Sequence, residues 1–240
     1  GALSPVPTAG FAVRVIDCLG AATGHPFVPA RDRFEAMGGK DAAVEVSAAL
    51  AVVAVSLTRI ANDLRWLASG PRCGIGEINL PALQPGSSIM PGKVNPVIPE
   101  MVLMAAARVI GNHQSITLGG MSGSFELNVM MPLIASDLLQ SIQLIGNAAG
   151  LLADRCVAGI TANRERCAEL VERSLAMVTV LAPRIGYDLA AAIAREALDS
   201  GRTVREICVE RKVLPEAELE ELLDARRQTE GGIPADGREG

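Results

Sequence analysis

The chain has 240 residues and a formal net charge of −5, and its acidic and basic residues are interspersed. This balance provides no basic stripe for a nucleic acid and no polybasic patch for a membrane surface. Charged and amide residues break the apolar stretches before the ~18 to 20 residues that a membrane helix requires, and no signal peptide opens the sequence. We therefore expect a soluble cytoplasmic protein that binds neither nucleic acid nor membrane.

The composition favours helices over sheets. Hydrophobic residues make up 49% of the chain, but aromatic residues make up only 2%. A core built from Ala, Val, Leu, Ile and Met is typical of closely packed helices, so we predict an all-α fold. The five cysteines are odd in number and widely spaced, and the chain has only two histidines. This pattern indicates free thiols and no metal site.

The first long helix is predicted from Lys40 to Leu67, because its apolar residues follow helical spacing. Residues 48–57, in the middle of this helix, are apolar on nearly every side. A helix of this kind is buried all round, and a chain of this length encloses few such helices by itself. We therefore expect partner subunits to cover it.

Two more long helices follow in the sequence. One is predicted to begin near Pro96 to Glu100, with Asn95 as its N-terminal cap, and to end at Gly119-Gly120. The other is predicted from Phe125 to Ala158, where Pro132 either kinks the helix or starts it one turn later. Together with the first, these helices predict a long-helix bundle.

Shorter and more charged segments follow Gly159, which indicates a second, smaller domain. We place the boundary near Ala162, so that residues 1–162 form the central bundle and residues 163–240 form a small helical domain with a frayed tail from Thr229. The local signals are a cap at Asn163 for a helix over 164–174, a helix over 187–200 ended by Gly201, a capping box at Thr203, and a last short helix from Pro215.

The most informative stretch lies between the first two long helices. It reads Gly86-Ser87-Ser88-Ile89-Met90-Pro91-Gly92-Lys93-Val94-Asn95-Pro96. Its glycines and prolines set unusual backbone angles without a packed core, so the loop can close over a ligand. Lys93 and Asn95 supply a positive charge and hydrogen-bond donors. That combination suits a carboxylate.

This loop resembles the signature loop of the fumarase/aspartase superfamily, and in its full form it is most similar to the loop of class II fumarase or aspartase. The resemblance extends from about Phe11 almost to the C-terminus. Class II fumarases are about twice this length, so we expect the chain to be the C-terminal half of such an enzyme, without the N-terminal domain and the first part of the bundle. The resemblance also implies a homotetramer and a reaction without metal or organic cofactor.

The resemblance assigns roles to individual residues. Ser87 matches the catalytic serine of the family, and Lys93 and Asn95 match its substrate-binding pair. From its residue type and place, Ser88 is interpreted as a loop donor that binds the substrate, or as a backbone cap, rather than as a second base. Glu100 matches a carboxylate that orients a histidine of another subunit, although a glutamate that stabilises the first turn of a helix explains this residue almost as well.

The chemistry of elimination from a four-carbon dicarboxylate agrees with these residue types. A base must remove a proton next to one carboxylate, and a cation must hold the charge that builds there. A serine hydroxyl is a poor base at neutral pH, so Ser87 would act as the oxyanion, stabilised by backbone N–H groups of the loop and by Lys93. The predicted activity is the reversible hydration of fumarate to L-malate, a step of the tricarboxylic acid cycle.

Two alternatives stay open. Aspartase uses the same loop but expels ammonia, and the segment Pro96–Glu100 is as similar to aspartase as to fumarase. Trp66 and the run from Arg72 to Ile78 favour fumarase. The other alternative is a non-catalytic helical oligomerisation module, because the portion that carries the catalytic histidine in the family is not in this chain.

Overall fold

The computed structural model describes residues 10–70 and 72–230, and the structural statements that follow refer to these residues. Helices account for most of them, and each of the two strands in this part of the chain has two residues. The all-α prediction is confirmed. The chain divides into two compact units: one holds the residues up to Ile75 together with Leu80–Ile160, and the other holds Gly76–Asn79 together with the residues from Thr161 onward.

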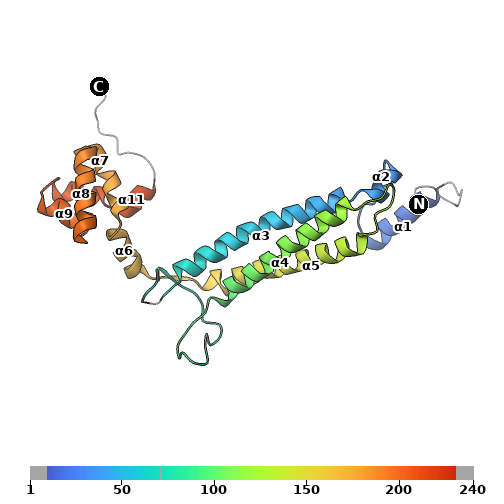
Figure 1. Ribbon diagram of the computed structural model, residues 1–240, viewed down its shortest axis with the longest axis horizontal. Helices are drawn as coiled ribbons and strands as arrows, with labels where there is room; N and C mark the ends of the chain where they lie inside the picture. The colour runs from blue at the N-terminus through green and yellow to red at the C-terminus, as the bar shows by residue number, and fades with distance from the viewer. Residues whose placement is uncertain (1–9, 71, 231–240) are drawn as a thin grey trace, which may run out of the picture. The chain divides into compact units, whose positions relative to one another are not determined.

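Three long helices form the first unit: α3 (Asp41–Leu67), α4 (Val97–Met121) and α5 (Met131–Arg155). They lie side by side in alternating directions, and α4 packs against both α3 and α5 (Figure 1). The sequence analysis did not predict the two short helices that precede them, α1 (Phe11–Thr23) and α2 (Arg33–Gly38). The 3-10 helix η1 (Val157–Gly159) follows α5.

The bundle core is made largely of small side chains. On α3 the buried residues recur every seven positions, at Ser47, Ala54 and Ala61. This spacing places them on one narrow stripe that faces the neighbouring helices. Alanine on such a stripe lets the helix backbones approach closely, as the composition predicted. The buried apolar partners on α4 and α5 are Val102, Ala105, Ala106, Val109, Ile145, Ala148 and Leu152.

The predicted end of α4 at Gly119-Gly120 is wrong, because the helix continues through both glycines to Met121. The glycines serve packing instead. A Cβ atom on Gly119 would lie 2.8 Å from Cγ1 of Ile134 on α5, and a Cβ atom on Gly120 would lie 2.8 Å from Cγ2 of Val44 on α3. The pair therefore permits three helices to approach one another closely here, which a rule for helix ends does not detect.

The predicted cap of α4 is also wrong. Pro96, which has no polar side chain, occupies the N-cap position of this helix. Pro99 lies in the first turn, where a missing N–H group costs little, as the sequence predicted. The side chain of Asn95 is used elsewhere, because its Nδ2 atom donates a hydrogen bond to the backbone oxygen of Gly86 at 2.9 Å.

Helix α5 begins at Met131 rather than at Phe125. Residues 122–130 form a turn in which Ser124 and Leu127 exchange two backbone hydrogen bonds of 2.8 and 3.1 Å. Phe125 has a φ of 52°, in the left-handed region, so it cannot lie within a right-handed helix. Pro132 lies in the first turn of α5, which is the alternative in which this proline starts the helix.

The surface of α3 is more apolar than the sequence analysis allowed. The helix contains an 18-residue window with a mean hydropathy of 1.8, and by length and composition alone it could cross a membrane. The prediction that polar residues break every such stretch is therefore wrong, although core helices of soluble proteins meet the same criterion. Only 11% of that window is buried within this chain, and Val52 and Val55 are 66% and 59% exposed. The described residues leave much of the apolar surface of α3 uncovered.

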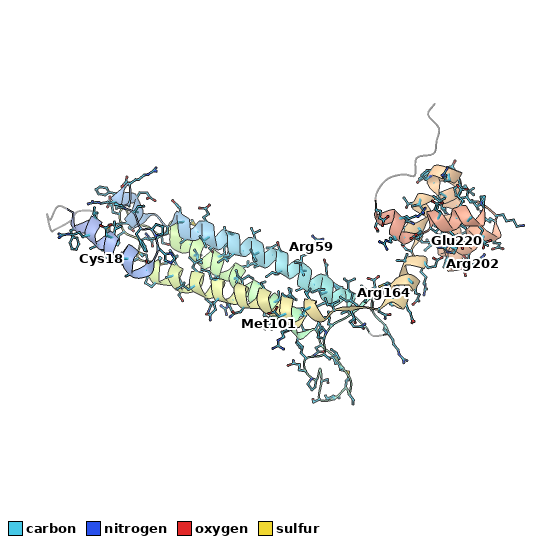
Figure 2. All side chains as sticks on the ribbon, turned by 180° about the vertical axis from the view of Figure 1, so that it is seen from behind. Cys18, Arg59, Met101, Arg164, Arg202 and Glu220 are labelled. Carbon is cyan, nitrogen blue, oxygen red and sulfur yellow. The ribbon has the colours of Figure 1, made fainter. Side chains whose placement is uncertain are left out.

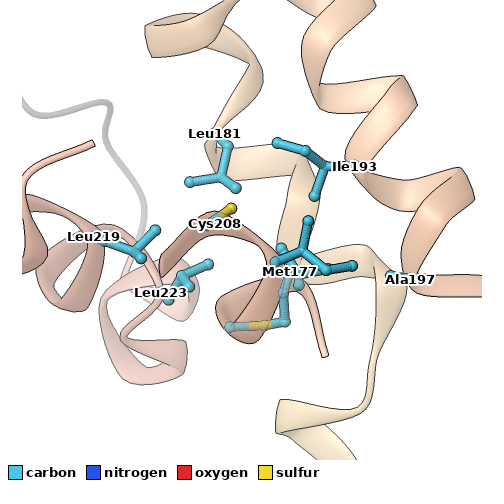
Figure 3. Packing of buried hydrophobic residues seen from close by; sticks show 9 residues of the cluster. Met177, Leu181, Ile193, Ala197, Cys208, Leu219 and Leu223 are labelled. Atoms are coloured by element: carbon cyan, nitrogen blue, oxygen red, sulfur yellow. The ribbon is translucent and has the colours of Figure 1, made fainter. Parts of the chain in front are cut away.

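The second unit is a cluster of short helices. They pack around nine buried apolar residues, and Leu181, Ile193, Cys208 and Leu219 converge between the helices in Figure 3. The elements are β1 (Ile78–Asn79), β2 (Thr161–Ala162), α6 (Arg164–Glu172), η2 (Leu175–Val180), α7 (Ala182–Ile185), α8 (Tyr187–Ser200), α9 (Val204–Glu210), α10 (Glu216–Leu222) and α11 (Ala225–Thr229).

A small sheet accounts for the four residues that join this unit from earlier in the sequence. β1 pairs antiparallel with β2, with Ile78 opposite Ala162 and Asn79 opposite Thr161. The backbone N–H of Asn163 also donates to the oxygen of Glu77 at 2.8 Å. Residues 76–79, which lie within the predicted first domain, therefore group with the second unit.

Most local signals read from the sequence of this unit are confirmed, but the helix predicted from Pro215 as the last one is followed by a further helix, α11. Asn163 accepts a hydrogen bond from the backbone of Arg166 and caps α6. Thr203 and Glu206 form the reciprocal capping box at α9. Gly201 ends α8 with a φ of 70°, a conformation that favours glycine. Most of the predicted frayed tail, residues 231–240, lies outside the described residues.

The prediction of free thiols is confirmed for all five cysteines. Burial raises the pKa of the Cys156 thiol in the first unit. Burial also raises the pKa of the Cys208 thiol in the second unit, and the nearby charge of Arg211 opposes this in part. Both thiols are therefore protonated at neutral pH and act as small apolar core residues.

Candidate functional site

The loop singled out by its sequence, residues 86–96, lies between α3 and α4. It precedes the start of α4 in the first unit and contains neither helix nor strand (Figure 1). Figure 2 draws the side chains of the first unit as sticks, and Met101 marks α4 there. The loop is thus held at its C-terminal side by a rigid helix, which is a suitable support for a binding site.

Two hydrogen bonds close the base of the loop. The backbone N–H of Gly86 donates to the oxygen of Lys93 at 2.9 Å, and Nδ2 of Asn95 donates to the oxygen of Gly86 at 2.9 Å. We call this contact between Gly86 and residues 93–95 the neck of the loop. A Cβ atom on Gly86 would lie 2.5 Å from the oxygen of Lys93, so a glycine is required for this close approach.

Ser87 follows the neck directly, and its hydroxyl oxygen is an acceptor. The backbone N–H groups of Ile89 and Met90 donate to Oγ of Ser87 at 3.1 and 3.2 Å. These bonds shape a local turn, as serine side chains often do in loops. Two N–H groups directed at one oxygen would also stabilise a negative charge on that oxygen.

Ser87 and Lys93 share a hollow of about 420 Å³ that is open to solvent. Gly86, Met90, Gly92 and Val94 complete the side of the hollow that the loop provides. A hydroxyl with two N–H donors, together with a lysine ammonium, gives the hollow the character of an anion site. The structure therefore brings together the predicted base and the predicted cation.

Part of the lining of the hollow was missed by the sequence analysis. It is formed by residues 82–85, directly before the motif. Pro81 and Pro85 bracket this segment in the sequence. Two prolines four residues apart restrict the backbone, and this was the signal that could have extended the motif toward the N-terminus.

The other three predicted site residues lie outside the lining of the hollow. Ser88 is exposed. Asn95 is half-buried in the neck. Glu100 lies half-buried in the first turn of α4, where its negative charge is favourable next to the helix N-terminus. The proposed roles of these three residues at a substrate therefore rest on the resemblance.

Metal-ligating side chains do not gather in the described part of the chain, where no three His, Cys, Asp or Glu residues lie close enough to hold one metal ion. Among the described residues, Lys93 is the one charged residue that lines the hollow. The chemistry that this chain offers at the loop is thus that of a hydroxyl, an ammonium and backbone N–H groups.

Comparisons with known proteins agree on one family. Residues 6–111 match the family described as Lyase, and residues 177–230 match the family described as Fumarase C C-terminus. A class II fumarate hydratase from Xylella fastidiosa is 50% identical over 223 residues, which cover 93% of this chain and 47% of that protein. The chain spans about half the length of the curated relatives it matches.

Solved structures agree with the sequence matches. The fumarate lyase:delta crystallin from Brucella melitensis bound to cobalt matches with a TM-score of 0.86 and 46% identity, covering 92% of this chain and 48% of that one. Recombinant class II fumarase from Schistosoma mansoni matches with a TM-score of 0.83 and 37% identity, covering 90% of this chain and 48% of that one.

Proposed function

Because this chain belongs to the class II fumarase family of the fumarase/aspartase superfamily, we propose that it forms part of a lyase that reversibly hydrates fumarate to L-malate. By the complete enzyme we mean a polypeptide of the relatives' length that contains these 240 residues. The observation that carries the proposal is the acceptor geometry at Ser87. Two backbone N–H groups point at its Oγ atom, in the same hollow as Lys93.

Ser87 is the base in this proposal. In the direction from malate to fumarate, its alkoxide removes the proton from the carbon next to one carboxylate, and the N–H groups of Ile89 and Met90 offset the charge on Oγ before the transfer. The electron pair left on carbon spreads into the carboxylate, which then carries close to two negative charges. Lys93 stabilises that charge, and the hydroxyl on the next carbon leaves as water once an acid has protonated it.

The remaining assignments of the resemblance complete the proposal. Ser88 and Asn95 contact the substrate, and Glu100 orients a histidine of another subunit. Residues 1–162 form the central domain, and residues 163–240 form a small C-terminal domain. The complete enzyme is a cytoplasmic homotetramer that acts in the tricarboxylic acid cycle. It uses no metal or organic cofactor, and it binds neither nucleic acid nor membrane.

The activity is tested by following fumarate in the complete enzyme with and without added ammonia. We expect fumarate to be consumed in water alone, with L-malate as the product, and the rate to be independent of ammonia. Consumption that requires ammonia would establish an aspartase instead. A complete enzyme that is folded and consumes no fumarate under either condition would contradict both lyase activities.

Loss of the loop cation is expected to damage both binding and turnover. Lys93→Met in the complete enzyme should lower kcat/KM by roughly a hundredfold to a thousandfold, because the ammonium contacts the carboxylate in the ground state and more strongly as charge builds. Lys93→Arg should not restore activity, since a planar guanidinium does not replace a compact ammonium.

Steady-state kinetics on these variants measures the effect. Lys93 is exposed, so its loss should leave the melting temperature unchanged. Lys212→Met, at an exposed lysine of the second unit, is the matched control and should retain kcat/KM. If KM rose while kcat stayed at the wild-type value, Lys93 would contribute uniform binding only.

The exposed apolar face of α3 supports assembly into the tetramer. Burying such surface is favourable by ~25 cal/mol per Å², so helices of several subunits are expected to pack together there. We expect the complete enzyme to sediment as a tetramer, and Val52→Glu or Val55→Glu to shift it to smaller species, because burying an unpaired charge costs several kcal/mol per ion.

Val28→Glu provides the control for these variants. Val28 is 80% exposed and lies before α2, outside the three-helix bundle, so its charge should not change the sedimentation. A complete enzyme that sediments as a stable, well-folded monomer would contradict the assembly.

A further inference from the structure

The side-chain amide of Asn95 is bound to the loop itself. Its Nδ2 atom donates to the oxygen of Gly86, and the N–H of the same glycine donates to the oxygen of Lys93, each at 2.9 Å. Both the N–H and the C=O group of Gly86 are therefore hydrogen-bonded, the N–H to Lys93 and the C=O to Asn95. Ser87 follows Gly86 directly, Lys93 is itself part of the neck, and both residues line the hollow.

The rest of the loop has little packing to hold it. Ile89 is 86% exposed, Met90 is 52% exposed, and Ser88 is exposed. Side chains in contact with water do not fix a backbone, so the order of the loop depends on its internal hydrogen bonds. These are the neck, the two bonds to Oγ of Ser87, and the 3.3 Å bond from the N–H of Lys93 to the oxygen of Met90.

We propose that Asn95 is a positioning residue that acts through Gly86, so that the neck sets the place of Ser87 and Lys93 in the ligand-free enzyme. This inference rests on the proposed function, because it assumes that Ser87 and Lys93 are the working groups. It gives Asn95 an action before the substrate arrives, in addition to the substrate contact that the resemblance implies. Gly86 takes part as the acceptor and as the residue whose missing Cβ lets the neck close.

Hydrogen exchange without substrate tests the neck alone. In the complete enzyme, Asn95→Ala should raise the exchange rates of the Ile89 and Met90 amides about threefold to tenfold, since the net contribution of one hydrogen bond is lost. Asn79→Ala is the matched control. It removes an exposed side-chain amide that donates to Thr161 in the small sheet, outside the loop, and should leave both exchange rates unchanged.

A double-mutant cycle tests whether the two residues act together. Gly86→Ala keeps the Asn95 side chain but forces the neck open, because the new Cβ would meet the backbone of Lys93 at 2.5 Å. Each single variant should lower kcat about tenfold, and Gly86→Ala, which keeps the substrate contact of Asn95, should change KM less than threefold. The kcat of the double variant should be no lower than that of the poorer single variant, because either substitution alone already removes the neck.

The outcomes separate the possibilities. Faster exchange in Asn95→Ala, with non-additive losses of kcat, supports the positioning role. Unchanged exchange, or a loss confined to KM that adds to the effect of Gly86→Ala, overturns it and leaves Asn95 as a substrate ligand. If the wild-type enzyme has no lyase activity, the proposed function fails, while the exchange result still decides whether the neck orders the loop.

Discussion

Expressed alone, the 240-residue chain is expected to show no measurable turnover of fumarate or L-malate. The hollow at the loop holds the proposed base and cation, Ser87 and Lys93, but it is open to solvent, and the described residues that line it include no carboxyl group or imidazole to protonate a leaving hydroxyl. Elimination needs the base and the acid on the substrate together. The chain spans about half the length of the curated relatives it matches, and we expect the acid and further substrate contacts to come from the rest of the enzyme and from other subunits.

A fumarate absorbance assay measures this directly. The purified chain should retain a helical circular dichroism spectrum, which shows that an absent rate does not arise from unfolding. The complete enzyme, assayed at equal molar concentration, is the positive control. Turnover by the pure 240-residue chain at a normal enzyme rate would contradict this prediction, because copies of this chain would then contain a full set of catalytic groups.

The long helices could be predicted, and their ends only in part. Apolar residues at helical spacing located α3, and the caps at Asn163 and Thr203 were found because each is a local contact within one turn. Gly119-Gly120 was misread as a helix end, since the contacts that these glycines permit are with side chains on two other helices. Sequence spacing within one helix contains no information about such tertiary contacts.

The candidate site could likewise be predicted only where its contacts are local in sequence. Ser87 and Lys93 lie six residues apart in one loop, so the sequence could place them close together, and both line one hollow. The function of Asn95 as a donor to Gly86 was not foreseen, because a cap and a bond across a loop use the same amide. The role that the resemblance gives Glu100 depends on a histidine of another subunit, whereas its place in the first turn of α4 follows from local sequence alone.

The largest effect of a single substitution in the complete enzyme is expected at Ser87. Ser87→Ala should lower kcat by roughly a hundredfold to ten-thousandfold, which is the usual contribution of a positioned general base. The fold and KM should change little, because Ser87 lies in a solvent-exposed loop and water can replace its oxygen as partner of the Ile89 and Met90 N–H groups.

Ser88→Ala is the matched control for this change. Ser88 is the next residue, also a serine, but it is exposed and does not line the hollow, so its loss should cost kcat much less. Saturation kinetics on both variants shows which hydroxyl is the base, since kcat is measured at saturating substrate and does not depend on differences in substrate binding. Equal and modest losses in the two variants would mean that neither hydroxyl removes the proton. The N–H groups directed at Oγ of Ser87 would then serve only to shape a loop that binds the substrate.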